Sequence, residues 1–290
     1  MERFHTILQA AGRQARGRRL FVSGQYDAAA LEAVTRARVL GWVVPVACGR
    51  AFRGVSGEME VVCREDDVDA ARTEAFGLAV REDALVLDTG PLDAGFFSSL
   101  ERKGTISYVS LLEAPKDGRL ILLTDPLLDH GSDMREKIGV AENAVRAARS
   151  LGVEAPKAAV LSALELVNPA IPSTLEAAVL SKMSDRGQFG DAVIEGPLAM
   201  DNAESASAAE HKGIHSPVPG DVDIYLFPDL ESAQTTARFL TLLGRSPLAG
   251  VLLGTSCPLV VRSPLEPSGS WLPNLAAALL CRENAPRGRV

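Results

Sequence analysis

Short runs of apolar and β-branched residues alternate with longer amphipathic stretches along almost the whole chain. Runs of about five residues bounded by turn-forming residues predict buried strands, and the stretches of about ten to twenty residues between them predict helices. This alternation is typical of βαβ units, which build a mostly parallel sheet with helices packed on its faces. We therefore predict an α/β fold.

The same pattern predicts where the individual elements lie. An amphipathic helix is expected within 1–19, and this segment lacks the continuous apolar core of a signal peptide. Strands are expected at 19–23, 43–47, 60–62, 84–87, 106–112, 119–124, 158–162, 192–195, 222–227, 250–253 and 259–262. Helices are expected at 26–40, 67–80, 93–102, 132–151, 173–185, 203–211, 230–243 and 269–281, with Ser132 as the N-cap of the fourth.

The composition excludes several classes of function. A net charge of −7 without a basic block does not suit a nucleic-acid-binding protein. No apolar run approaches the roughly 18–20 residues that a membrane span needs, and the four cysteines form no CxxC pair. We expect free thiols in a reducing cytoplasm, with Cys257 buried and inert rather than nucleophilic. Because the four histidines form no HExxH motif, no metal site is expected.

Gly, Ser, Thr, Asn and Asp follow many of the predicted strands, at the sheet edge where α/β proteins bind ligands. The exposed N–H groups of a helix N-terminus favour anions, so these segments suggest a phosphorylated ligand. The chain has neither a P-loop nor a GxGxxG fingerprint. The segments in question are 88–90, 124–126, 168–169, 195–197, 228–229, 254–256 and 262–263.

Several motifs in the second half are distinctive: KMSDRGQ at 182–188, IEGPLAMDNA at 194–203, HKGI at 211–214 and SPVPGDVD at 216–223. Asn168-Pro169 with PST at 172–174, PDLE at 228–231, ENAV at 142–145 and Pro156-Lys157 fit the same pattern. From about 120 to 260 the chain resembles the phosphate acetyl/butyryltransferase family, and the butyryl branch most closely. The first hundred residues resemble it only in pattern.

The resemblance implies two α/β domains with mostly parallel sheets around a cleft, an architecture similar to that of isopropylmalate dehydrogenase. One domain would comprise 1–133 plus 258–290, and the other 134–257. Members of the family move an acyl group between coenzyme A and phosphate. They use no metal or cofactor, with coenzyme A as a substrate, and they are usually homodimers. A cytoplasmic homodimer that binds a CoA thioester and phosphate or an acyl phosphate is the corresponding expectation.

Such a transfer needs a base for the thiol proton, donors for the oxyanion and cations for the phosphate. On the resemblance, Arg262 would supply the charge and Glu266 the base. The cleft would also be lined by Thr124, Ser132, Gly196, Pro197 and Asn202, with N–H donors from Ser132 and the loop at Gly196. Other interpretations remain open: Gly196-Pro197 also suits a plain strand-to-helix turn, Asn202 an N-cap, and Pro126 the end of a strand.

The chain departs from the family at four positions that would face an anion. Leu87-Asp88 replaces a Lys-Gly pair, Tyr108 a His, Asp129 an Asn and Pro264 an Arg. Every change makes the anion site less positive. A non-catalytic or retuned relative, binding CoA, another small metabolite or a protein partner, is therefore the alternative to a phosphate acyltransferase. A third hypothesis, an oxidoreductase of the dehydrogenase type, would need clustered metal carboxylates that the sequence does not assemble.

Overall fold

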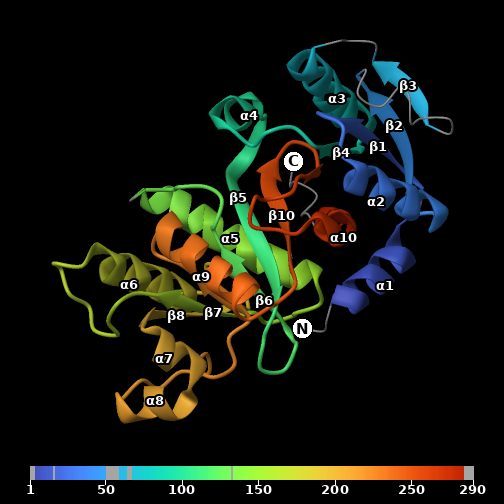
Figure 1. Ribbon diagram of the computed structural model, residues 1–290. Coiled ribbons are helices and arrows are strands. Elements are labelled where there is room, and N and C mark those ends of the chain that lie inside the picture. Colours follow the sequence, from blue (N-terminus) through green and yellow to red (C-terminus); the bar gives the residue numbers. More distant parts are fainter. Residues whose placement is uncertain (1–3, 16, 50–58, 64–66, 132, 284–290) are drawn as a thin grey trace. The chain divides into compact units, whose positions relative to one another are not determined.

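The computed structural model describes residues 4–15, 17–49, 59–63, 67–131 and 133–283, and its elements are mixed α and β (Figure 1). Its contacts divide the chain into two compact units. The terminal unit comprises Phe4–Ile106 and Ala249–Glu283, and the middle unit comprises Ser107–Leu248. The predicted α/β class with mostly parallel strand pairing is confirmed.

The strands of the terminal unit follow the order β3-β2-β1-β4-β11-β10. All of its pairs for which a register is known are parallel except β10 with β11. The strands are β1 (Arg18–Ser23), β2 (Val43–Cys48), β3 (Glu60–Cys63), β4 (Leu85–Asp88), β10 (Leu248–Thr255) and β11 (Leu259–Val260). The helices are α1 (Phe4–Gln14), α2 (Ala28–Val39), α3 (Val68–Glu82), α4 (Ala94–Ser99) and α10 (Trp271–Glu283), the last preceded by a 3-10 turn at Ser268–Ser270.

The strands of the middle unit follow the order β5-β6-β9-β7-β8. Only β5 with β6 is antiparallel among these pairs. The strands are β5 (Arg102–Glu113, which begins in the terminal unit), β6 (Leu120–Thr124), β7 (Lys157–Leu161), β8 (Val193–Leu198) and β9 (Ile224–Leu226). The helices are α5 (Met134–Ser150), α6 (Pro172–Asp185), α7 (Met200–Glu204), α8 (Ala206–His211) and α9 (Leu230–Leu242).

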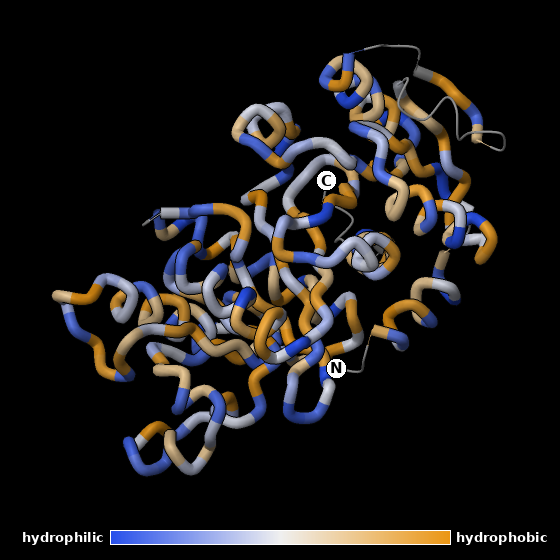
Figure 2. The backbone as a smooth tube through the Cα atoms, viewed as in Figure 1, coloured by the Kyte–Doolittle hydropathy of each residue, from blue (hydrophilic) through white to orange (hydrophobic). Residues whose placement is uncertain are grey.

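Central strands of both units are buried on both faces. Every residue of β4 and of β6 is buried, which explains why they appear in the sequence as continuous apolar runs rather than as alternating ones. Most helices also carry exposed polar residues, whereas α10 is buried along nearly its whole length, and hydrophobic and hydrophilic stretches alternate along the chain in Figure 2. In α1 the buried residues are Ile7 and Ala11, and the helix packs against α10. No helix among the described residues is long and apolar enough to span a membrane.

Aspartate side chains begin most of the longer helices. Asp133 is the N-cap of α5, where its carboxylate accepts a hydrogen bond from the Arg135 N–H. The predicted cap, Ser132, lies outside the described residues. Asp27, Asp67, Asp93 and Asp229 cap α2, α3, α4 and α9 in the same way.

Two predicted elements differ from the structure. The helix expected at 203–211 is broken into α7 and α8 at Ser205, whose hydroxyl caps α8 by accepting from the Ala208 N–H. The strand expected to end at Glu195 continues to Leu198. Gly196 and Pro197 therefore lie inside β8, and the prediction of a loop there is wrong.

The contacts also assign three strands differently from the predicted domains. The predicted boundaries at 133/134 and 257/258 place β5 and β6 in the first domain and β10 in the second, whereas most of β5 and all of β6 belong to the middle unit and Ala249–Thr255 of β10 to the terminal unit. In the structure β6 pairs in parallel with β9, with Leu122 opposite Ile224, and both belong to the middle unit. As a division into domains, the predicted boundaries remain a prediction.

Candidate active site

The middle unit holds a cavity of about 50 Å³ where the carboxyl ends of β6, β7 and β9 meet. Thr124 lies at the end of β6, Leu161 at the end of β7 and Leu226 at the end of β9. The end of a parallel strand, where the chain turns toward a helix, is the usual place for a ligand in α/β proteins.

Asp125 and His130 form a hydrogen-bonded pair in the wall of this cavity. The Asp125 side chain is 2% exposed, and its carboxylate accepts hydrogen bonds from the backbone N–H groups of Tyr108, at 2.7 Å, and of Leu127 and Leu128, both at 2.9 Å. Its Oδ2 also lies 2.9 Å from Nε2 of His130. Because an ionised carboxylate only accepts, this contact assigns the ring proton of a neutral His130 to Nε2.

Two further groups border the cavity. The Lys137 ammonium donates to the Glu176 carboxylate and, at 3.0 Å, to the Pro228 carbonyl oxygen. Thr124 is 1% exposed, and its Oγ1 is buried without a hydrogen-bond partner. A buried hydroxyl usually has a hydrogen-bond partner. The Thr124 hydroxyl is therefore either a candidate for ligand binding or a group that lowers the stability of the fold. Of the predicted substrate-binding residues that the structure describes, Thr124 is the one that lines the cavity.

Gly196 and Pro197 do not line this cavity. Both are buried in β8, and a Cβ added to Gly196 would lie 2.8 Å from Cβ of Val160 and 3.2 Å from Cβ of Ala177. The glycine therefore allows the strand to pack closely against β7 and α6. Its N–H donates to Oε1 of Glu195 at 2.9 Å. Because this N–H is already bound to Glu195, the contact does not support its expected role as a hydrogen-bond donor to phosphate.

Asn202 lies in a polar cluster of α7 and α8. It is completely buried, with Nδ2 3.4 Å from Oε2 of Glu165 and Oδ1 without a partner. The Lys212 ammonium lies 3.3 Å from Oε2 of Glu165 and 3.2 Å from Oδ2 of Asp201. The hydrogen bond with Lys212 lowers the pKa of the exposed Asp201 carboxyl, and the same contact raises the pKa of Lys212.

Arg262 and Glu266 lie together in the terminal unit. Nη1 of Arg262 donates to the Glu266 carbonyl oxygen at 2.8 Å, and the guanidinium lies 5.8 Å from the centre of the Trp271 ring. Nε of Arg262 is buried without a partner. The Glu266 side chain is 4% exposed and accepts hydrogen bonds at Oε2 from Ser270 Oγ at 3.1 Å and Asn274 Nδ2 at 2.7 Å.

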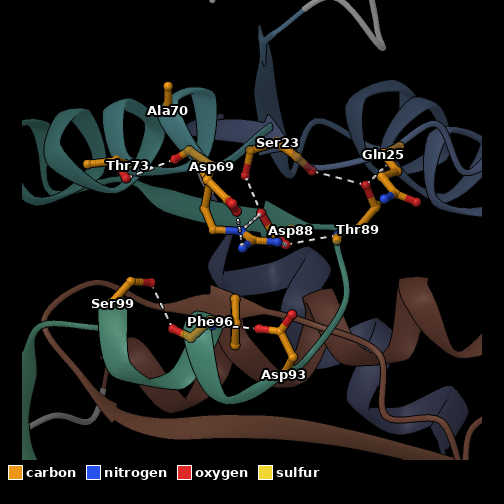
Figure 3. Close-up of polar contacts among 12 residues, drawn as sticks. Ser23, Gln25, Asp69, Ala70, Thr73, Asp88, Thr89, Asp93, Phe96 and Ser99 are labelled. Carbon is orange, nitrogen blue, oxygen red and sulfur yellow. Dashed lines mark hydrogen bonds and ion pairs between the residues drawn. The ribbon is translucent and has the colours of Figure 1, made fainter. Parts of the chain in front are cut away.

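The carboxyl end of β4 carries a second, fully paired ion cluster. Asp88 accepts from Nε and Nη2 of Arg72 at 3.0 and 3.2 Å, and from Ser23 Oγ at 2.7 Å (Figure 3). Nη1 of Arg72 donates to Asp69 at 2.9 Å. Leu87, which stands in place of a lysine in the resemblance, is wholly buried. This end of β4 therefore offers a neutralised guanidinium in place of a free cation.

The structure thus joins Arg262 with Glu266 and places Thr124 at the cavity, while Asn202 lies in a separate cluster and Ser132 lies outside the described residues. Sequence reasoning missed His130, Lys137 and Glu176. Nothing in the local sequence links Lys137 to Glu176, 39 residues away. His130 could have been found from its position just after the Thr124-Asp125 motif. No group of three or more His, Cys, Asp or Glu suited to a metal ion occurs among the described residues.

Comparison with known proteins gives consistent matches. A family model described as "Phosphate acetyl/butaryl transferase" matches residues 98–266. Phosphate butyryltransferase of Clostridium acetobutylicum is 42% identical over 180 residues, which are 62% of this chain and 60% of that protein. Phosphate acetyltransferase of Thermotoga maritima is 34% identical over 268 residues, which are 86% of this chain and 90% of that protein.

Solved structures match over nearly the whole chain. A branched-chain phosphotransacylase from Enterococcus faecalis superposes with a TM-score of 0.78 at 26% identity, covering 91% of this chain and 99% of its own. The EutD phosphotransacetylase from Staphylococcus aureus has the same TM-score at 16% identity, covering 98% of this chain and 100% of its own. The second likeness concerns the fold alone.

Proposed function

This chain belongs to the phosphate acetyl/butyryltransferase family, and from that premise we propose that it is an enzyme that transfers an acyl group between coenzyme A and phosphate. The observation that carries the proposal is the family match over 98–266. That range includes the cavity at the ends of β6, β7 and β9 and also the Arg262–Glu266 pair. Coenzyme A is a substrate in this reaction, and no further cofactor or metal is proposed.

In this proposal the terminal unit supplies the phosphate cation. Arg262 keeps a buried N–H without a protein partner, and a dianionic phosphoryl oxygen is a suitable acceptor for it. Glu266 is the proposed base for the thiol proton, and its hydrogen bonds to Ser270 and Asn274 fix the orientation of the carboxylate. Thr124, Ser132, Gly196, Pro197 and Asn202 remain the proposed substrate-binding residues, with the Gly196 contribution limited to shape.

A coupled assay tests the reaction directly. Purified protein is mixed with phosphate and with acetyl-, butyryl- or isobutyryl-CoA, and release of the CoA thiol is followed with a thiol reagent. We expect phosphate-dependent release with at least one acyl-CoA. Release equal to the background with all three substrates would contradict the proposal.

One observation favours the alternative of a non-catalytic or retuned relative. The guanidinium of Arg72 is bound by Asp88 and Asp69, so the end of β4 presents no free cation. In that case the protein would still bind CoA or another metabolite, and calorimetric titration with CoA would detect binding without turnover.

The assembly and location follow the family expectation. We propose a cytoplasmic homodimer that binds its two substrates without nucleic acid or membrane. Light scattering at micromolar concentration tests the assembly, and a mass near 31 kDa, that of the 30.7 kDa monomer, would contradict it.

A further inference from the structure

The cavity in the middle unit has the shape and lining of a site for an alkyl chain. We propose, resting on the proposed acyl transfer, that it binds the alkyl part of a short acyl group and so determines which acyl-CoA the protein accepts. The ligand class is a saturated chain of about three or four carbons beyond the carbonyl.

Beside the buried Thr124 and Asp125, the buried lining of the cavity contains five apolar side chains from regular elements, which are called its floor here. Val140 comes from α5, Val160 and Leu161 from β7, Leu180 from α6 and Leu226 from β9. All five side chains are at most 7% exposed. Side chains on packed helices and strands hold their positions, so this floor can discriminate chain length.

The volume sets that length. A water-sized group needs about 10–15 Å³ of such space, so about 50 Å³ holds roughly three to five methyl-sized groups. A propyl chain fits within that range, and a pentyl chain reaches its upper limit. Each methylene moved from water into an apolar floor improves binding by about fourfold. Butyryl should therefore be preferred over acetyl, and hexanoyl, which reaches the limit of the volume, should gain no further binding over butyryl.

The charges around the cavity argue against phosphate as its occupant. Four carboxylates line it, those of Asp125, Asp129, Glu176 and Asp229, against one ammonium, that of Lys137. Lys137 is already bound by Glu176 and the Pro228 carbonyl oxygen. A dianion would meet net negative charge here, whereas an uncharged alkyl chain would not.

The acyl carbonyl would then face the exposed mouth of the cavity. Asp129 and Gly131 are exposed there and His130 is partly exposed, and all three border the cavity. Only this end of an acyl-CoA continues into the bulky CoA group, so the alkyl end must enter first. Asp125 holds the His130 ring in place at this point.

Substitutions at Leu180 test the proposal in both directions. Leu180→Phe fills the cavity and should lower the ratio of kcat/KM for butyryl-CoA to that for acetyl-CoA by at least tenfold. Leu180→Ala enlarges it and should raise the ratio for hexanoyl-CoA over butyryl-CoA by about fivefold or more. The matched control is Leu175→Phe on the same helix, because Leu175 is 41% exposed and lies outside the lining. It should leave both ratios within about twofold.

Unchanged ratios in both Leu180 variants would overturn the proposal. The two variants act with opposite sign, so a general loss of activity cannot imitate the pattern. If Leu180→Phe does not fold, as judged by circular dichroism, the rise expected for Leu180→Ala still decides the matter.

A binding measurement separates this proposal from the acyl-transfer activity itself. Saturation-transfer NMR with butyryl-CoA in the absence of phosphate compares the butyryl methyl signal with the adenine signals. We expect strong methyl saturation with the native protein and its loss in Leu180→Phe while the adenine signals persist. If this pattern of saturation is seen but the protein shows no turnover, the acyl site is supported and the proposed acyl transfer is rejected. A native protein that saturates only adenine would overturn the acyl site.

Discussion

The carboxylate of Asp88 holds the guanidinium of Arg72 through two hydrogen bonds, Nε to Oδ2 at 3.0 Å and Nη2 to Oδ1 at 3.2 Å. The Arg72 side chain is 6% exposed and that of Asp88 is 0% exposed. Asp88→Asn keeps the shape but removes the buried counterion of Arg72 and leaves only the exposed carboxylate of Asp69 beside the guanidinium. We expect the free energy of unfolding to fall by about 3–5 kcal/mol, measured by urea denaturation followed by circular dichroism.

Asp69→Asn is the matched control for that change. Asp69 contacts the same guanidinium at 2.9 Å, but its side chain is 84% exposed. Solvent screening limits the contribution of such a contact to about 0–1 kcal/mol. If both variants lost the same free energy of unfolding, burial would not explain the contribution of the Arg72–Asp88 pair.

Thr124 and Thr174 are both buried, but only the second has hydrogen-bond partners for its hydroxyl. Thr124→Val removes an unpaired polar group and should stabilise the protein by up to about 1 kcal/mol. Thr174→Val breaks contacts with Asn168 and Ile171 and should cost about 1–2 kcal/mol. Thermal unfolding of the two variants measures the difference. If Thr124 binds substrate, its variant loses activity despite being more stable.

Arg262→Ala tests the proposed phosphate cation. Charge-assisted contacts contribute roughly 1.5–3 kcal/mol each, so turnover of butyryl-CoA with phosphate should fall by about ten- to a hundredfold. Arg262→Lys should restore only part of it, because a point charge does not replace the planar guanidinium. Arg36→Ala, an exposed arginine of the same unit, is the control. Full native activity in Arg262→Ala would reject the assignment.

Glu266→Gln separates a base from a structural carboxylate. The amide oxygen can still accept from Ser270 and Asn274, so the fold should persist. General-base catalysis contributes about 10²–10⁴-fold, and kcat should fall by that amount while the melting temperature stays within a few degrees. A variant that retains kcat within threefold would show that Glu266 only holds its segment together.

Cys257 should be unreactive in the folded protein. Burial raises the pKa of its thiol from 9.0 to about 11. At pH 8 the thiolate fraction is then about a hundredfold lower than in the unfolded chain. Alkylation by iodoacetamide, followed by peptide mass spectrometry, should be slower by at least that factor and should accelerate as the pH rises toward 11. Rapid labelling of the native protein at pH 8 would contradict this.

Much of the fold could be predicted because buried parallel strands carry their own signal. The strand expected at 119–124 is β6, Leu120–Thr124, and that expected at 43–47 is β2, Val43–Cys48. Both strands coincide with short continuous runs of apolar residues, which can be recognised in the sequence without knowledge of their partners. The helix caps were less predictable, because Ser132 and Asp133 are neighbours and either side chain could cap α5.

The candidate site could be predicted only in part. The motif at Thr124-Asp125 follows a predicted strand, and this position indicated the sheet edge at which the cavity lies. The same reasoning expected a loop at Gly196-Pro197, which the structure incorporates in β8. A strand can extend through a Gly-Pro pair when its neighbour supplies the pairing, and that neighbour, β7, lies 36 residues earlier at Val160.

The sequence by itself determined the class of fold, the family and the segments from which a site could be built, because periodicity and motifs are properties of adjacent residues. Only the tertiary structure decided which of those residues meet. The pairs Arg72–Asp88 and Lys137–Glu176 are 16 and 39 residues apart. Their contacts depend on strand register and helix packing, which are set by burial over the whole unit rather than by local preference.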